Sequence, residues 1–312
     1  MNDEGRILFA TRAYAALGRR VAETAGCRLG AVHAETWKDG ELYQRIETAV
    51  EDRDVALVAG TDTEARTLEA FDLAFALCGQ GARRLTLLIP FFGYSTMERA
   101  WLPGEAVAAA SRARIWSALP RPPGGLRIRI LEPHTSGLPH YFDPGARVEA
   151  IDGLPMLLDW LRGFESRAPV LCSPDTGRIK WVDAAALKAG KDSAFVVKRR
   201  GGRGGVEALG LAGSVRDRYV ILCDDMIRTG GTLIAAAKRC REAGAAGVSA
   251  LAVHGAFTPD ALAEIGGSGI LDALQCSDSH PHSEGGLPDW VTVRSCVPLL
   301  ASAWLAGIGK AP

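Results

Sequence analysis

A pair of carboxylates followed by a glycine turn is the strongest chemical signal in the chain. Asp224 and Asp225 follow the apolar run 219–223, and Thr229-Gly-Gly-Thr232 opens an alanine- and leucine-rich stretch. Glycines let the backbone amides of a turn face an anion, and the N-terminus of a following helix adds a favourable dipole. Adjacent carboxylates suit the vicinal hydroxyls of a sugar or a hydrated magnesium ion. The pattern predicts a site for a phosphorylated sugar; the alternative is an ordinary strand–turn–helix with threonine capping.

A basic segment beside a run of glycines is the second candidate. Lys198, Arg199 and Arg200 follow the apolar residues 195–197 and precede Gly-Gly-Arg-Gly-Gly at 201–205. Alternate residues of an extended chain point the same way, so Lys198 and Arg200 are expected to reach one anion together. Two cations stabilise charge on a transferred phosphoryl group, and glycines allow such a segment to close as a lid. The alternative is a solvated basic loop.

Two further residues follow predicted strands and suit a metal or its waters. Asp175 comes after 170–172 and before a glycine turn, where a carboxylate oxygen can hold magnesium. The alternative for Asp175 is a helix N-cap. His134 follows 127–131, and for a lone histidine a structural role remains the alternative.

An aromatic residue with two acids close behind it suits a purine. Trp37 offers a ring face on which a base can stack, and Asp39 and Glu41 can accept hydrogen bonds from an exocyclic amine. The alternative is a buried tryptophan followed by a turn.

Apolar runs alternate with alanine- and leucine-rich stretches along the chain. Strands are expected at 7–9, 55–58, 85–89, 128–131, 170–172, 195–197, 219–223, 248–253 and 271–274. Helices are expected at 14–25, 64–77, 105–119, 184–189 and 233–242. Continuous apolar strands between helices predict an α/β fold whose parallel sheets are covered on both faces. The two sets of runs predict domains at 1–146 and 147–312, with the last helix expected to pack on the N-terminal half.

Composition excludes several classes of protein. Lys+Arg and Asp+Glu each number 36, so no strongly basic field favours nucleic acid or an anionic membrane. No apolar run is long enough to span a bilayer, and residues 1–6 lack a signal-peptide core. The cysteines form no Cys-x-x-Cys motif, which favours buried thiols in a reducing cytoplasm.

Six segments in the same order resemble the ribose-phosphate pyrophosphokinase, or phosphoribosyl-pyrophosphate synthetase, family. They are Trp37–Glu41, Pro90–Ser95, Glu132–His134, Ser173–Gly177, Lys198–Arg200 and Asp224–Thr232. The resemblance implies two phosphoribosyltransferase-like domains, each a mainly parallel sheet flanked by helices, with the ATP side in the first and the ribose-phosphate loop in the second. It implies transfer of pyrophosphate from ATP to the C1 hydroxyl of ribose 5-phosphate, giving phosphoribosyl pyrophosphate and AMP. Mg²⁺ and a homo-oligomer of dimer units, with a hexamer as one arrangement, are implied too.

The same resemblance implies roles for single residues. Lys198 and Arg200 are implied to be catalytic, while His134 and Asp175 position the metal. The implied ribose 5-phosphate residues are Asp224, Asp225, Arg228, Thr229, Gly230, Gly231 and Thr232. The implied ATP residues are Trp37, Asp39, Glu41 and Arg99, and Trp37–Glu41 is implied to reach the nucleotide of a neighbouring subunit.

Four positions depart from the family pattern. Thr96 and Met97 stand where the family usually has Arg and Gln, Arg228 where it has Asp, and Arg178 where it has the second glycine of the pyrophosphate loop. The two added cations have the right sign to lie near phosphates. These departures leave two alternatives open: a non-catalytic, synthetase-associated regulatory paralogue, and a phosphoribosyltransferase that consumes the same pyrophosphate.

Overall fold

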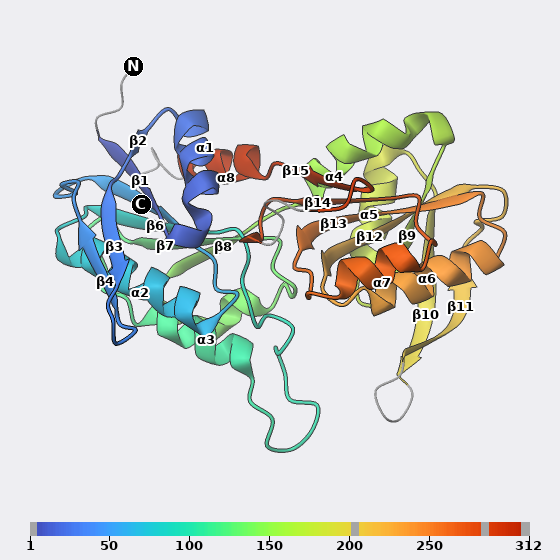
Figure 1. Cartoon of the computed structure of the whole chain (residues 1–312), viewed down its shortest axis with the longest axis horizontal. Coiled ribbons are helices and arrows are strands. Elements are labelled where there is room, and N and C mark those ends of the chain that lie inside the picture. The colour runs from blue at the N-terminus through green and yellow to red at the C-terminus, as the bar shows by residue number, and fades with distance from the viewer. Residues whose placement is uncertain (1–4, 201–205, 282–286, 307–312) are drawn as a thin grey trace. The chain divides into compact units, whose positions relative to one another are not determined.

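The computed structural model describes residues 5–200, 206–281 and 287–306, and for 198–200 and 206–209 the backbone alone. The chain divides into two compact units, drawn in Figure 1. The first unit joins Met1–Asp152 to Cys296–Pro312, and the second is Gly153–Ser295. Each unit contains its own mainly parallel sheet with helices on both faces, so the predicted fold class is confirmed.

The first unit is built on a sheet of parallel strands in the order β2-β1-β5-β6-β7-β8. The strands are β1 Arg6–Ala10, β2 Arg28–Leu29, β5 Asp54–Val58, β6 Arg84–Ile89, β7 Leu126–Leu131 and β8 Arg147–Ile151. Every residue of β5 is buried, as expected of a strand covered on both faces.

Helices cover both faces of this sheet (Figure 1). The helical elements are η1 Arg12–Tyr14, α1 Ala15–Ala25, α2 Glu64–Gly79, α3 Ala108–Ser117, η2 Leu138–Tyr141 and α8 Val297–Leu305. Helices α2 and α3 bury Leu73 and Trp116 in one core, while α1 and α8 pack together on the other face, where Leu17 and Trp304 are buried. At the start of α2 the Thr63 hydroxyl accepts a hydrogen bond from the backbone N–H of Arg66, which fixes where the helix begins.

A two-stranded hairpin stands apart from this sheet. Strands β3 Val32–Thr36 and β4 Leu42–Ile46 are antiparallel, pairing Val32 with Ile46 and Thr36 with Leu42. Their side chains are exposed or half-buried, so no apolar run marks these strands in the sequence.

The second unit contains a larger sheet in the order β11-β10-β9-β12-β13-β14-β15. Its strands are β9 Val170–Ser173, β10 Ser193–Arg200, β11 Val206–Ala212, β12 Tyr219–Ile227, β13 Gly247–Gly255, β14 Ala273–Ser277 and β15 Val291–Arg294. All neighbours are parallel except β10 and β11, which are antiparallel. Because β9 and β12 are parallel neighbours, the loops that follow them leave the sheet at the same edge.

Helices again cover both faces. The helical elements are α4 Leu154–Leu161, η3 Arg162–Arg167, α5 Ile179–Ala189, α6 Gly231–Glu242 and α7 Ala261–Gly267. Helices α6 and α7 supply Leu233, Ala237 and Ile265 to a core that includes Val220 and Val248 of the central strands. None of the helices in the described part of the chain is long and apolar enough to cross a membrane.

The division between the units lies beyond the predicted boundary at 146/147. Strand β8 begins at Arg147 and pairs with β7, so it completes the first sheet and the first unit continues to Asp152. This strand has a mixed sequence, with Arg147 exposed and Glu149 half-buried, so no continuous apolar run marks it. Helix α8 packs against α1, which returns the end of the chain to the first unit.

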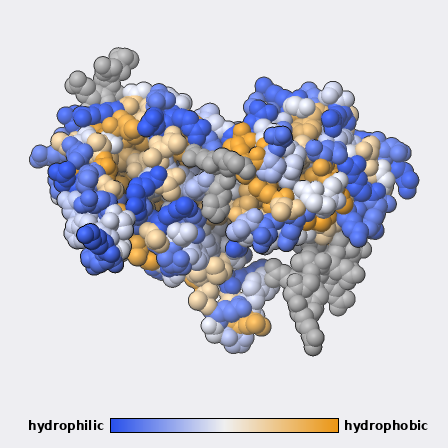
Figure 2. Space-filling view, in the orientation of Figure 1, coloured by the Kyte–Doolittle hydropathy of each residue, from blue (hydrophilic) through white to orange (hydrophobic). Residues whose placement is uncertain are grey.

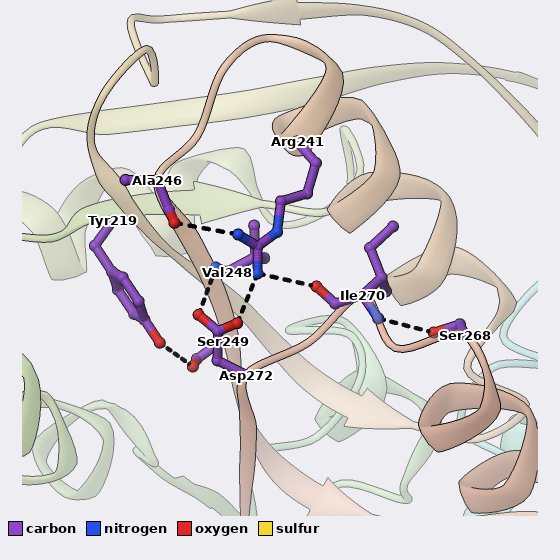
Figure 3. A network of polar contacts seen from close by, with 8 residues as sticks. All are labelled: Tyr219, Arg241, Ala246, Val248, Ser249, Ser268, Ile270 and Asp272. Carbon is purple, nitrogen blue, oxygen red and sulfur yellow. Dashed lines mark hydrogen bonds and ion pairs between the residues drawn. The ribbon is translucent and has the colours of Figure 1, made fainter.

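A polar network holds together the amino-terminal ends of three strands in the second unit (Figure 3). Arg241, from the last turn of α6, donates to the Asp272 carboxylate at 2.6 Å and to the carbonyls of Ala246 and Ile270. Asp272 also accepts from the backbone N–H of Val248 at 3.2 Å. These contacts lie at the end of the sheet opposite the loops after β9 and β12.

We expect Asp272→Ala to destabilise the second unit by about 1 kcal/mol, because it removes a charge-assisted bond and leaves Arg241 without its acid. Partial exposure of both side chains limits the loss. Arg239→Ala, which removes the exposed Arg239–Glu242 pair in the same helix, is the control and should change stability by less than about 0.5 kcal/mol. Urea unfolding measures both, and equal effects would contradict a special role for the network.

Candidate sugar-phosphate site

Acidic residues of the second unit gather where β9 and β12 end. Asp175 follows β9, and Asp224 and Asp225 lie in β12, which continues to Ile227. The predicted strand ended at residue 223; the longer strand arises because pairing with β13 continues beyond Asp224, to Met226 with His254 and Ile227 with Gly255. The two carboxylates are therefore set on a rigid strand rather than on a loop.

The Thr229–Thr232 turn joins this strand to a helix, as predicted. Gly230 has φ +80° and is the residue before α6, which begins at Gly231. A side chain on Gly230 would lie 2.6 Å from Cγ1 of the buried Ile265, so both the backbone conformation and the packing require glycine. The first amides of an α-helix have no carbonyl in a preceding turn to bond, so the start of α6 presents N–H groups suited to an anion.

Asp225 is held by an arginine. Arg178 donates from Nε to Oδ1 at 3.0 Å, and its Nη2 lies 2.5 Å from Oδ2. The Asp225 side chain is 3% exposed and the Arg178 side chain 13%. A buried carboxylate attracts the nearest guanidinium, and the pair satisfies both charges. The expectation that Arg178 lies near phosphates stays a prediction.

Asp224 lies in a different electrostatic environment from Asp225. Burial raises the pKa of the Asp224 carboxyl well above its ordinary range, and the negative charge of Asp225 raises it further. The charge of Asp175 acts in the same direction, whereas Arg178 lowers the pKa. The site therefore holds one carboxylate in an ion pair beside another that is costly to ionise.

Asp175 shapes its own loop. Its Oδ1 accepts the backbone N–H of Gly177 at 2.9 Å, and its carbonyl accepts the hydroxyl of Ser173 at 2.6 Å. The residue that precedes helix α5 is Arg178, so the helix N-cap alternative for Asp175 is wrong. Within the described residues no cluster of three or more His, Cys, Asp or Glu side chains is arranged to hold a metal ion.

Two other predicted groups belong to the second unit: Arg228, whose side chain is described, and Lys198 and Arg200, of which the backbone alone is described. Arg228 is exposed, and its carbonyl accepts the backbone N–H of Thr258 at 3.0 Å, which anchors the turn before Thr229. The backbones of Lys198 and Arg200 lie at the end of β10, opposite Ala208 and Val206 of β11, with a shift of register just before Lys198. The side chains of Lys198 and Arg200 lie outside the described part of the chain.

In the first unit, the predicted purine residues form the tip of the β3–β4 hairpin. Trp37 is 47% exposed and stacks on Tyr43 with ring centroids 5.4 Å apart, so the buried-tryptophan alternative is wrong. Asp39 accepts the backbone N–H of Glu41 at 3.1 Å, and Trp37 and Glu41 close the turn through a backbone hydrogen bond. The tip presents an aromatic face and two acids to solvent.

Arg99 belongs to the loop that protrudes before α3, on which Figure 2 shows hydrophobic and hydrophilic residues mixed. Its guanidinium lies 4.1 Å from the ring centroid of exposed Trp101, and its side chain is 62% exposed. His134 is half-buried in the segment after β7, in the first unit, whereas Asp175 belongs to the second.

One cluster in the first unit was not predicted from the sequence. Tyr94, at φ +62°, donates its hydroxyl to Glu64, and Arg112 stacks over the Tyr94 ring at 4.5 Å. Gly93 precedes it, and a side chain there would collide with the carbonyl of Thr61, 2.1 Å away. The Pro-Phe-Phe-Gly-Tyr segment, which the sequence marked as family-like, was the available signal.

We expect Gly230→Ala to destabilise the protein by about 1–3 kcal/mol, because the left-handed conformation becomes strained and the new methyl group meets Ile265. Gly231→Ala is the matched control: a Cβ there meets Thr229 Oγ1 at 3.9 Å, an ordinary contact, and stability should change by less than about 1 kcal/mol. Urea unfolding of both variants measures the difference; equal losses would contradict the assignment of the constraint to Gly230.

We expect Asp224→Asn to raise the melting temperature, and the gain to grow as pH increases. The unfolded carboxyl loses its proton near its ordinary pKa, whereas the folded one retains it to higher pH, so the wild type loses stability as pH rises through that window. Asparagine carries no such penalty. Calorimetry from about pH 5 to about pH 8 measures the gain, and a gain that shrinks with rising pH would contradict the raised pKa.

Comparison with known proteins agrees with this architecture. Residues 6–119 match the model of the N-terminal domain of ribose phosphate pyrophosphokinase, and residues 206–285 match that of a phosphoribosyl synthetase-associated domain. A ribose-phosphate pyrophosphokinase of Synechococcus elongatus is 29% identical over 94% of this chain and 88% of its own length. The chloroplastic ribose-phosphate pyrophosphokinase 2 of Oryza sativa subsp. japonica is 32% identical over 94% of this chain and 73% of its own.

A solved structure extends the similarity to three dimensions. The phosphoribosylpyrophosphate synthetase of Mycobacterium smegmatis superposes with a TM-score of 0.85 at 27% identity, over 97% of this chain and 98% of that one. Two family models, relatives along nearly the whole length and a shared fold all lead to one assignment: the chain belongs to the ribose-phosphate pyrophosphokinase family.

Proposed function

We propose that this protein transfers the diphosphate group of ATP to the C1 hydroxyl of ribose 5-phosphate, giving phosphoribosyl pyrophosphate and AMP. The observation that carries the proposal is the arrangement in β12 and α6: two carboxylates on a buried strand, then a glycine turn and a helix N-terminus. Family membership over nearly the whole chain supports the same activity. In this proposal the first domain serves ATP and the second holds the sugar phosphate.

Ribose 5-phosphate binds through both of its ends. The N–H groups at the start of α6, with the hydroxyls of Thr229 and Thr232, receive the 5-phosphate, because helix N-termini stabilise anions. Arg228 is exposed beside this turn and adds a positive charge of the right sign. Asp224 and Asp225 accept hydrogen bonds from the sugar hydroxyls, which orients the C1 hydroxyl for reaction.

The transfer is an in-line displacement at the β-phosphorus of ATP. A bond forms between the C1 oxygen and that phosphorus, the bond from the phosphorus to the α,β-bridging oxygen breaks, and AMP leaves with the bonding electron pair. The C1 hydroxyl releases its proton to solvent as it attacks. Lys198 and Arg200 are the catalytic residues in this proposal, because two cations stabilise the charge that spreads over the transferring group.

The ATP side rests on residues of the first unit. Trp37 stacks on the purine and Asp39 and Glu41 accept hydrogen bonds from its amine, which the exposed hairpin tip makes possible. Arg99 pairs with the phosphates by leaving the face of Trp101. Because the tip is exposed and its implied role is toward a neighbour's nucleotide, we also propose a homo-oligomer of dimer units.

Magnesium is the metal that this reaction needs, and the donors present suit it. Mg²⁺ is usually held by one or two carboxylates together with substrate phosphates, and the half-buried Asp175 offers such an oxygen, with His134 near the phosphates. When bound, magnesium neutralises phosphate charge and so weakens its repulsion of the incoming oxygen. We further propose a cytoplasmic location, supported by the fact that the seven cysteines, all described, form no disulfide.

A regulatory, non-catalytic role is the second candidate. The observation that favours it is the pairing of Asp225 with Arg178. The guanidinium contacts both oxygens of a carboxylate that, in the enzyme, would hold the sugar. An assay of AMP release from ATP by the purified protein, with and without ribose 5-phosphate, separates the two. Release that depends on ribose 5-phosphate, with phosphoribosyl pyrophosphate formed in equal amount, supports the enzyme; its absence at all magnesium concentrations supports the regulatory role.

We expect Lys198→Ala to lower kcat by at least about 100-fold, because a preorganised charge at the transferring group is lost. The affinity for ribose 5-phosphate should change little, since the sugar is held by β12 and α6. Lys188→Ala, which removes an exposed lysine of α5, is the control and should retain normal turnover. Steady-state kinetics measure both variants. Near-normal turnover by Lys198→Ala would contradict a catalytic role for Lys198 and support the alternative of a solvated basic loop.

A further inference from the structure

The contact between Arg178 and Asp225 joins two segments that are distant in sequence. Arg178 lies immediately before α5, in the loop after β9, and Asp225 lies in the neighbouring strand β12. One guanidinium engages both carboxylate oxygens, Nε with Oδ1 at 3.0 Å and Nη2 with Oδ2 at 2.5 Å. Such a two-point contact is the strongest form of arginine–carboxylate pairing.

The pair is buried, so separating the two side chains costs free energy. With 3% of Asp225 and 13% of Arg178 exposed, water contributes little to the solvation of either charge. If the arginine left without a replacement, a buried carboxylate would remain uncompensated, which costs several kcal/mol in proteins. Any event that moves Arg178 must therefore supply Asp225 with another partner.

Three acids share this end of the sheet. Asp175 and Asp225 both act on Asp224 as negative charges, and Arg178 acts on it as a positive one. Carboxylate oxygens are the ligands that hard divalent cations prefer, although the described residues include no group of three or more such side chains arranged to hold one. Here the side chain of the protein itself supplies the positive charge.

We propose that Arg178 takes the place of a divalent cation at the Asp224–Asp225 pair, so that no metal ion stands between this pair and the sugar. A magnesium ion on Asp225 would have to bind, at about 2.0–2.1 Å, a carboxylate oxygen that already accepts from the positively charged guanidinium. A cation added beside the guanidinium would meet strong repulsion at such short range. Metal and Arg178 therefore exclude one another.

The consequence for ligand binding rests on the proposed function. Ribose hydroxyls are neutral donors, so they can bond to the outer side of the carboxylate pair while Arg178 stays in place. Binding of ribose 5-phosphate is then independent of divalent cations, and the reaction needs the metal for ATP alone. The exclusion of metal from Asp225 holds whether or not the sugar binds.

Manganese binding to the substrate-free protein tests the exclusion directly. Electron paramagnetic resonance of free Mn²⁺ gives the number and affinity of sites in the wild type, Arg178→Gly and Arg178→Gln. We expect each variant to gain one site that binds Mn²⁺ at least about tenfold more tightly than the wild type does there. Adding Asp225→Asn to either variant should remove that site.

Control variants separate this effect from a general change in charge. Arg218→Gln also removes one positive charge and an ion pair, with Asp192, at the start of β12, and should leave Mn²⁺ binding as in the wild type. Circular dichroism checks that each variant is folded, and Arg178→Gln keeps a side chain of similar length if the glycine variant is not. Folded variants that bind Mn²⁺ no better than the wild type would overturn the proposal. So would a wild-type Mn²⁺ site that Asp225→Asn abolishes.

A calorimetric titration with ribose 5-phosphate tests the consequence. In EDTA and in Mg²⁺ the wild-type affinities should agree within about twofold, whereas Arg178→Gln should bind more tightly with Mg²⁺ than with EDTA. A wild type that binds the sugar phosphate solely with Mg²⁺ would overturn the cation replacement. A wild type that binds none under either condition would overturn the proposed function instead, and the Mn²⁺ titration then decides the role of Arg178.

Discussion

Burial of negative charge at the end of β12 is the constraint on which the second unit depends. Asp224 and Asp225 are adjacent in a largely buried strand, Asp224 half-buried and Asp225 buried, so protein groups must compensate much of their charge. Arg178 compensates Asp225 directly, and the loop after β9 is placed to deliver it because β9 is the parallel neighbour of β12. Asp224 has no comparable guanidinium contact among the described pairs, and its pKa rises accordingly.

This arrangement concentrates unfavourable electrostatic energy at the end of β12. A carboxyl that resists ionisation and a carboxylate held by a buried cation are both poor choices for stability alone. In the proposed function sugar hydroxyls offset this cost, because they supply hydrogen bonds that the carboxylate oxygens can accept. The rigid strand beneath keeps both groups in place between binding events, and the tight turn at Gly230 fixes the helix N-terminus next to them.

The general architecture could be read from the sequence because buried parallel strands are continuous apolar runs, as in β5, β12 and β13. Several elements escaped, among them two with another pattern: the half-exposed hairpin β3–β4 and the charged edge strand β8. The Thr229–Thr232 turn was predicted because glycine and threonine have local conformational meaning. The partner of Arg178 was not, since a contact across 47 residues depends on which strands become neighbours.

The network around Arg241 and Asp272 has a further consequence for how the second unit fluctuates. It joins the amino-terminal ends of strands through side-chain bonds, at the end of the sheet away from the carboxylates (Figure 3). Local opening in a protein begins where backbone groups have the fewest tertiary contacts. Amide hydrogens near Val248 should therefore exchange with solvent at the pace of global unfolding, and those of the Asp175 and Thr229 loops much sooner. The strands are then held most firmly at their amino-terminal ends, and the loops at the opposite end of the sheet can open locally while the core stays folded.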